Sequence, residues 1–419
     1  MTEANRTEQP PRGRRGGSAV YSLMSQAANS GGNLLLAVFV ARQVTPTEFG
    51  AWSIGYAAYM MALAVVRSLS CTPLLLGRHE SPEALRKASS GAVGLALCLG
   101  LAMSVVVGAL GWAAVDLRGA LIPFALCMPL LLAQDVLRHF GFAGSRPSIP
   151  AALDVSWVAL QCAAFVALTL VGANSMGIAT VVWAISALPA VLWLSIRSHF
   201  VPRRDAIASF WRETRADGVK LLADSALASA VTQALPVLVA ASAGLAAAGA
   251  LRGGFTLMGG INVLVAGLTP IATLAARRQQ DASGDVHRFL WSWSAVLFVV
   301  SVFNGALLLA LPESLGRELL GSTWETASLL ILPLALHSML RGPFTGVPIA
   351  LRASDRVGAA LRLRVWTTLP SVVLPWTGAL VFGLHGAVWG IVLSAVVANG
   401  MALRAVRRGR WSEIRGVAS

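Results

Sequence analysis

Apolar segments of about 20 residues fill almost the whole sequence, and they limit the folds that this chain can adopt. A segment of that length and composition crosses a bilayer as a helix. Only 12% of the 419 residues are charged, about half the usual share in a soluble domain. No connector is long enough to bury a soluble core of its own. The sequence therefore predicts an all-α membrane protein with about twelve transmembrane helices, at residues 20–41, 49–74, 91–115, 119–138, 150–171, 176–196, 219–243, 250–275, 289–311, 324–342, 362–383 and 386–404.

The positive charges alternate between rich and poor loops along these segments. If the N-terminus is placed in the cytoplasm, 28 of the 33 Lys and Arg residues fall on the inner side. Four fall on the outer side, namely Arg42, Arg118, Arg252 and Arg317, and Arg67 lies within a segment. Cytoplasmic loops are enriched in these residues. We therefore expect a multi-pass membrane protein with both termini in the cytoplasm, and no nucleic-acid partner.

The two halves of the chain resemble each other. Residues 34–52 align with residues 235–251, so that Gly50 corresponds to Gly249. A half-chain offset is typical of parallel six-helix repeats with a site between them. We expect a disordered cytoplasmic tail at 1–17 without a cleavable signal peptide, six-helix bundles at 18–200 and 219–405, an interfacial linker helix at 201–218, and a basic cytoplasmic tail at 406–419.

Arg67 is the one fixed charge well inside the apolar run Phe49–Leu76. A guanidinium group does not lose its proton in proteins, and facing lipid it would cost about 2.5 kcal/mol or more. We expect Arg67 to face protein or a wet cavity and to mark a binding site. The alternative is that its side chain reaches the inner headgroups along its own stem.

Four stretches resemble the polysaccharide flippases (Wzx-type) of the multidrug/oligosaccharidyl-lipid/polysaccharide exporter superfamily. They are ARQVTPTEFGAW (Ala41–Trp52) followed by the span with Arg67, LRGGFTL (Leu251–Leu257), LLGSTWETASLLILPLAL (Leu319–Leu336) and GLHGAVWG (Gly383–Gly390). The resemblance implies two six-helix bundles, related by pseudo-two-fold symmetry around a central cavity. It also implies alternating access and an undecaprenyl-pyrophosphate-linked oligosaccharide as the substrate, moved across the inner membrane for surface polysaccharide (lipopolysaccharide-type) synthesis. The family would also suggest polysaccharide polymerase and glycosyltransferases as partners. It would suggest a proton or a sodium ion as the coupling ion.

A lipid-linked pyrophosphate needs fixed positive charge, and arginine binds phosphate through two parallel hydrogen bonds. The candidates for binding the pyrophosphate or glycan are Arg67, Arg252 at the start of the eighth span, and Arg341 at the inner end of the tenth. Alternatively, Arg252 is an ordinary arginine at the membrane interface. Arg341 could likewise be one of the positive charges that keep a loop in the cytoplasm. Lysine occurs only at Lys87 and Lys220, so a cationic lumen would have to be built from arginine.

Three aspartates lie within predicted spans. Asp135 and Arg138 are spaced i, i+3 and are expected to pair on one helix face, and Asp154 could join them. Asp224 lacks a local partner, so it is a candidate for ion coupling or for an intramembrane pair with Arg67.

Two other functions stay open. A MATE-like cation/drug antiporter would need an acidic, aromatic lumen, and a membrane polysaccharide polymerase or ligase would need a reactive cluster or a large outer loop. Neither pattern is evident, so we expect a transporter without enzymatic activity. We also expect no cofactor and no metal site, since the four cysteines form no CxxC pair and the histidines have no ligand spacing.

Overall fold

The structure is a computed structural model, and it describes residues 12–77, 79–173, 175–198, 200–259, 287–341, 347 and 357–408. These residues form helices joined by short turns, and no strand occurs among them. Seven helices are long and apolar enough to cross a bilayer, and one bent pair of helices raises the number to eight. Part of the predicted eighth segment, residues 260–275, lies outside the described residues.

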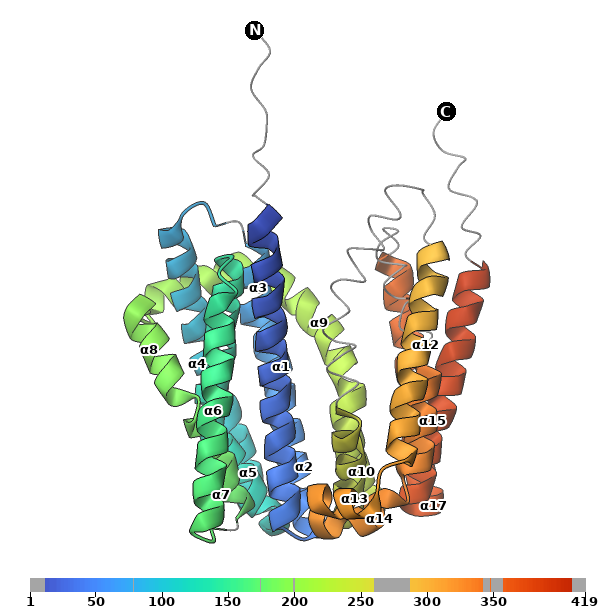
Figure 1. The fold of residues 1–419 in the computed structure, drawn as a ribbon. Coiled ribbons are helices and arrows are strands. Elements are labelled where there is room, and N and C mark those ends of the chain that lie inside the picture. The colour runs from blue at the N-terminus through green and yellow to red at the C-terminus, as the bar shows by residue number, and fades with distance from the viewer. Residues whose placement is uncertain are drawn as a thin grey trace, which may run out of the picture.

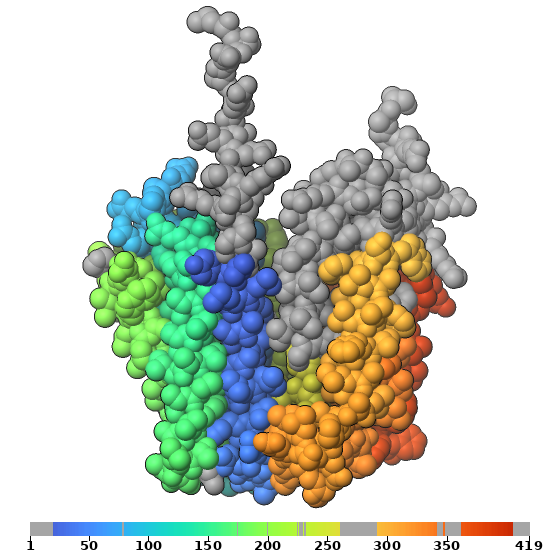
Figure 2. Space-filling model, in the orientation of Figure 1, coloured from blue at the N-terminus to red at the C-terminus, as the bar shows by residue number. Residues whose placement is uncertain are grey.

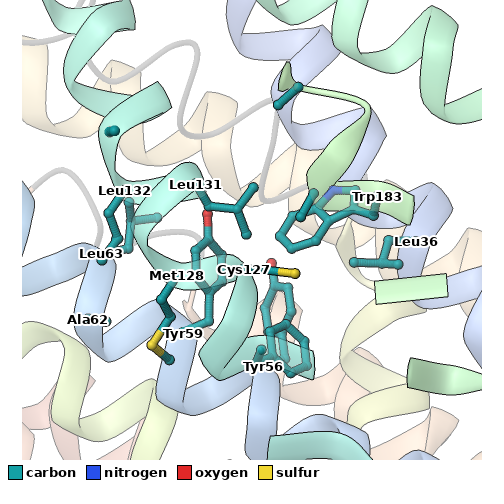
Figure 3. Close-up of a cluster of buried hydrophobic side chains, with 14 of the residues drawn as sticks. Leu36, Tyr56, Tyr59, Ala62, Leu63, Cys127, Met128, Leu131, Leu132 and Trp183 are labelled. Atoms are coloured by element: carbon teal, nitrogen blue, oxygen red, sulfur yellow. The ribbon is translucent and has the colours of Figure 1, made fainter. Parts of the chain in front are cut away.

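The N-terminal bundle contains one helix or broken helix for each of the first six predicted segments (Figure 1). Its large aromatic side chains pack in the interior, where the ring centroids of Tyr59 and Trp183 lie 5.5 Å apart (Figure 3). The elements are α1 (Arg12–Gln43), α2 (Pro46–Val66), the π-helical turn η1 (Arg67–Cys71), α3 (Thr72–Leu76), α4 (Pro82–Ala113), the short turn η2 (Val115–Leu117), α5 (Arg118–Ala143), α6 (Ser148–Leu170), α7 (Met176–Ile185) and α8 (Leu188–Ser198).

The second half contributes the remaining described helices. Non-helical backbone at Phe382 and Gly383 divides α17 between the predicted eleventh and twelfth segments. The elements are α9 (Arg204–Ala243), α10 (Leu245–Leu257), α12 (His287–Leu309), α13 (Glu313–Leu320), η3 (Gly321–Thr323), α14 (Trp324–Ser328), α15 (Ile331–Arg341) and α17 (Val357–Arg408).

Three boundaries differ from the expectations. Helix α1 begins at Arg12, because adding residues to an existing helix costs little. Helix α9 joins the expected linker helix and the seventh segment, since Gly218 is the only glycine or proline in it before Pro236. The tenth segment is broken: Glu313–Ser328 and Ile331–Arg341 meet at 92°, and Pro333 lies in the first turn of α15, where its missing N–H is tolerated.

The two bundles touch backbone to backbone where α2 and α10 begin. A Cβ atom built on Gly50 would lie 1.8 Å from the carbonyl oxygen of Leu245, and one on Gly249 would lie 2.2 Å from that of Pro46. The contact is reciprocal, because each glycine meets the first residue of the other helix. This is the contact expected of equivalent residues beside a pseudo-two-fold axis, and the pairing of Gly50 with Gly249 matches the alignment of the two halves.

The same end of the molecule is closed by a second contact between the halves. Helix α13 lies beside α1, and the two form a continuous surface at the lower end of Figure 2. The hydroxyl of Ser322 donates to the carbonyl oxygen of Val44 at 3.4 Å. The charge pattern predicts that this end faces the outside of the cell.

Gly249→Val should open this end, because the added side chain overlaps the backbone of α2. Oxidative cross-linking between Val44→Cys and Ser322→Cys reports the contact. We expect the cross-linked fraction to fall severalfold when Gly249→Val is added.

The matched control is Gly31→Val, since a Cβ atom on Gly31 meets no atom within 4 Å. Both experiments use a background with Cys98→Ser and Cys162→Ser, which removes the exposed thiols. Equal cross-linking in the Gly249→Val and Gly31→Val proteins would contradict the steric argument.

Candidate functional site

The turn that carries Arg67 owes its shape to a proline. Pro73 has no N–H to offer the carbonyl group four residues earlier, and the chain before it forms the π-helical turn Arg67–Cys71. The N–H of Thr72 accordingly donates to the carbonyl oxygen of Arg67, five residues back. Single π-helical turns inside helices are frequent at functional sites.

Arg67 forms a bidentate ion pair with Asp135 of α5. Its Nε donates to Asp135 Oδ2 and its Nη2 to Asp135 Oδ1, both at 2.8 Å. The side chain therefore points into the N-terminal bundle rather than toward the headgroups, although 41% of its surface is still accessible, against 4% for Asp135. A guanidinium group has five N–H donors, so three remain for another ligand.

Asp135 continues the network toward α6 and α1. Arg138 Nη1 donates to Asp135 Oδ1 at 2.9 Å, the pair expected from the i, i+3 spacing. Arg138 Nε donates to Asp154 Oδ2 at 2.9 Å, and the same oxygen accepts a hydrogen bond from the hydroxyl of Ser25. Four charges of alternating sign thus connect η1, α5 and α6, and Ser25 connects them to α1.

The four formal charges sum to zero, which makes the network tolerable inside a bilayer. The network is open at one end only: Asp154 is fully buried and Arg138 almost so, whereas Arg67 is partly accessible. The accessible part of the network is therefore Arg67, and the pair of Arg138 and Asp154 is enclosed. We call this set of Ser25, Arg67, Asp135, Arg138 and Asp154 the charge network.

One group of side chains has the spacing of a metal site. Cys71, Asp135 and His139 place one ligand atom each within 4.8 Å of one another. Arg67 and Arg138 already donate to both oxygens of Asp135, so a divalent cation there would lie against two guanidinium groups. The donor set fits an ion-pair network better than a metal.

Arg252 lies at the contact between the bundles. Its guanidinium carbon is 4.1 Å from the ring centroid of Tyr56 and 5.7 Å from that of Trp52. A cation over an aromatic face gains about 0.5–2 kcal/mol. Tyr56 precedes Arg67 by eleven residues on α2, which is about 16 Å along the axis and about 20° around it. Arg252 and Arg67 are therefore associated with one face of α2, about three turns apart.

The remaining predicted site residues are placed apart from these. Arg341 is the exposed last residue of α15 and belongs to the other bundle. Asp224 lies in α9, but its side chain is outside the described residues. The carboxylate that the structure pairs with Arg67 is Asp135, and the sequence analysis did not identify this pair or the part played by Ser25. The only signal in the sequence was the presence of opposite charges in two apolar segments.

Asp135→Asn should destabilise the bundle, because it leaves two guanidinium groups without their shared counter-charge. Breaking a buried pair in this way costs about 3–5 kcal/mol. We expect a clear fall in the temperature at which the detergent-purified protein loses its monodisperse chromatographic peak.

Two further variants separate charge from packing. Arg67→Gln combined with Asp135→Asn restores neutrality and should recover part of the loss. Asp116→Asn, in the exposed turn η2, should leave the temperature unchanged. An Asp135→Asn protein as stable as the wild type would show that the charge network does not hold these helices together.

No protein-family model and no curated protein sequence matches the chain. Solved structures do match over nearly its whole length. An inward-facing multidrug resistance MATE family transporter of the MOP superfamily superposes with a TM-score of 0.75 at 14% identity, over 96% of this chain and 100% of that chain.

Two other structures show the same architecture. The lipid II flippase MurJ in an inward closed conformation has a TM-score of 0.65 at 12% identity, over 93% of this chain and 87% of that chain. An outward-facing MATE family transporter has a TM-score of 0.57 at 14% identity, over 93% of this chain and 94% of that chain. The chain therefore has the all-α, multi-pass fold of the MOP-superfamily transporters, for which twelve helices in two bundles is the fitting layout.

Proposed function

We propose that the protein is an alternating-access flippase that moves an undecaprenyl-pyrophosphate-linked oligosaccharide across the inner membrane. The observation that carries the proposal is the accessible guanidinium group of Arg67. Asp135 holds it in place through two hydrogen bonds and leaves three N–H donors for a phosphate group. Charge-assisted hydrogen bonds of this kind are the strong ones in phosphate recognition.

The charges of the described spans favour an anionic substrate over a cationic one. Asp135 and Asp154 both bind guanidinium groups, so neither offers a free carboxylate to a cation. Arg252, on the same face of α2, supplies a second positive charge nearer the outer end. We propose Arg67 and Arg252 as successive contacts for the pyrophosphate, and Arg341 as a contact at the inner end of the second bundle.

The shape of the protein supports transport by exchange between inward- and outward-open forms. The contacts of α2 with α10 and of α1 with α13 close one end of the molecule. The TM-score is higher with the inward-facing MATE structure than with the outward-facing one, 0.75 against 0.57. This end would then be the outer one, with both termini in the cytoplasm, as the arginine distribution predicts.

A MATE-like cation/drug antiporter is the second candidate, because the similarity to MATE transporters is as good as the similarity to the flippase. Asp224, Asp135 and Asp154 would then be the acids to test for proton or sodium coupling. Efflux of a cationic dye that depends on this protein would favour the antiporter. A polymerase or ligase ranks third, since the structural neighbours are transporters.

Arg67→Gln combined with Asp135→Asn should abolish export while keeping the bundle neutral. Losing a charge-assisted contact of about 1.5–3 kcal/mol predicts at least a tenfold drop in translocation. The measurement is the amount of lipid-linked oligosaccharide on each leaflet in a deletion strain that carries the variant. The substrate should accumulate on the cytoplasmic leaflet, where polymerases and other outer-face partners cannot reach it.

Arg67→Lys keeps the charge without the two parallel donors and should export at an intermediate rate. Arg118→Gln, in a predicted outer turn, is the control and should export normally. Normal export by the Arg67→Gln, Asp135→Asn protein would exclude Arg67 from substrate binding.

A further inference from the structure

A cavity outside the charge network opens where α4, α5 and α8 meet. It has a volume of about 770 Å³. The turn before α4, the loop between α5 and α6, and the last turn of α8 form its walls. In the predicted topology these three segments lie at the cytoplasmic surface. The cavity shares no residue with the charge network.

Three arginines from three different elements line this cavity, namely Arg86, Arg146 and Arg197. All three side chains are exposed. Within the described part of the chain, no carboxylate lies within ion-pair distance of any of them, although Glu80 also lines the cavity. Three guanidinium groups around one concavity repel each other, and an anion between them would relieve that repulsion.

A left-handed turn at the end of α5 positions the middle arginine, Arg146. Ser145, the residue before Arg146, has φ of 54°, in the left-handed region that non-glycine residues seldom adopt. The N–H of Arg146 donates to the carbonyl oxygen of Gly141 at 2.8 Å, which fixes the loop. The N–H of Ser145 likewise donates to the carbonyl oxygen of Phe142 at 3.0 Å, so this loop is the Schellman turn that ends α5, and it holds Arg146 beside the cavity.

One side of the cavity borders an exposed apolar surface of α8. Trp193 lines the cavity and is 53% exposed, and Ile196, one turn further along α8, is 71% exposed. The cavity wall itself contains apolar side chains, including Leu85, Phe140 and Ile149. Indole groups of this kind anchor helices at the headgroup level of a bilayer. The cavity thus combines a cationic rim with an apolar path into the membrane.

We propose that this cavity binds the phosphate of an anionic lipid headgroup in the cytoplasmic leaflet, with the acyl chains along α8. Basic pockets between transmembrane helices on the cytoplasmic side recognise acidic headgroups. Arg86, Arg146 and Arg197 bind the phosphate oxygens, and Trp193 packs against the first carbons of the chains. The site does not depend on the nature of the transported substrate.

The test measures lipid binding to the purified full-length protein in detergent. The probes are dioctanoyl phosphatidylglycerol, dioctanoyl phosphatidylcholine, undecaprenyl pyrophosphate and inorganic phosphate. Arg86→Gln, Arg146→Gln and Arg197→Gln combined should weaken phosphatidylglycerol binding at least tenfold. The wild type should bind phosphatidylcholine at least tenfold more weakly than phosphatidylglycerol, because choline cancels the negative charge.

The matched control removes three other exposed arginines on the predicted cytoplasmic side, through Arg204→Gln, Arg212→Gln and Arg215→Gln. It should change binding less than twofold. Equal losses in the two triple variants would overturn the site in favour of diffuse charge. Competition by inorganic phosphate at the same concentration as the lipid would overturn the lipid assignment.

The two lipid probes identify the source of the phosphate. Tighter binding of undecaprenyl pyrophosphate than of phosphatidylglycerol, lost in the cavity variant, would support the site and assign it to the polyprenyl carrier. The reverse order would assign it to a bulk phospholipid. If the glutamine variant aggregates, the variant with Arg86→Lys, Arg146→Lys and Arg197→Lys replaces it, because lysine keeps the charge. The proposal requires this variant to bind phosphatidylglycerol more tightly than phosphatidylcholine by the same factor as the wild type.

Discussion

The ion pair between Arg67 and Asp135 is the interaction on which the candidate site depends. Without Asp135, the guanidinium group would be an uncompensated charge in an apolar bundle, which is strongly unfavourable. With it, Arg67 is held by two hydrogen bonds and remains partly accessible. Arg138 and Asp154 form a second ion pair next to Asp135, at the buried end of the charge network. The bundle therefore carries a positive group at an accessible position without a net charge inside it.

Close backbone contact between equivalent glycines determines how the two bundles meet. Gly50 and Gly249 allow α2 and α10 to approach until each lies against the carbonyl group of the other helix. The same approach brings Arg252 onto the ring of Tyr56. Small residues at a crossing are a general means of association in membranes, where water does not drive helices together. The close approach of Gly50 and Gly249 thus explains both the contact between α2 and α10 and the position of Arg252.

Much of the fold could be predicted from the sequence, because apolar length and arginine asymmetry report directly on the bilayer. The repeat also predicted the correspondence of Gly50 with Gly249, which the structure places in contact. The i, i+3 pair of Asp135 and Arg138 follows from helix geometry alone. The pairing of Arg67 with Asp135 could not be predicted, since the two are 68 positions apart and depend on how α2 packs on α5. The bend before α15 was not predicted either, since the sequence indicated one unbroken segment at 324–342.

Helix α9 has a mechanical consequence for any movement of the bundles. It packs on α4 in one bundle and on α10 and α17 in the other, as one helix of 40 residues that curves along its length (Figure 1). Near its middle, Gly218 rests against Leu69, in the turn that begins with Arg67. The two bundles are therefore linked by one helix that contacts the turn beginning with Arg67. A change in the angle between the bundles would act on that contact.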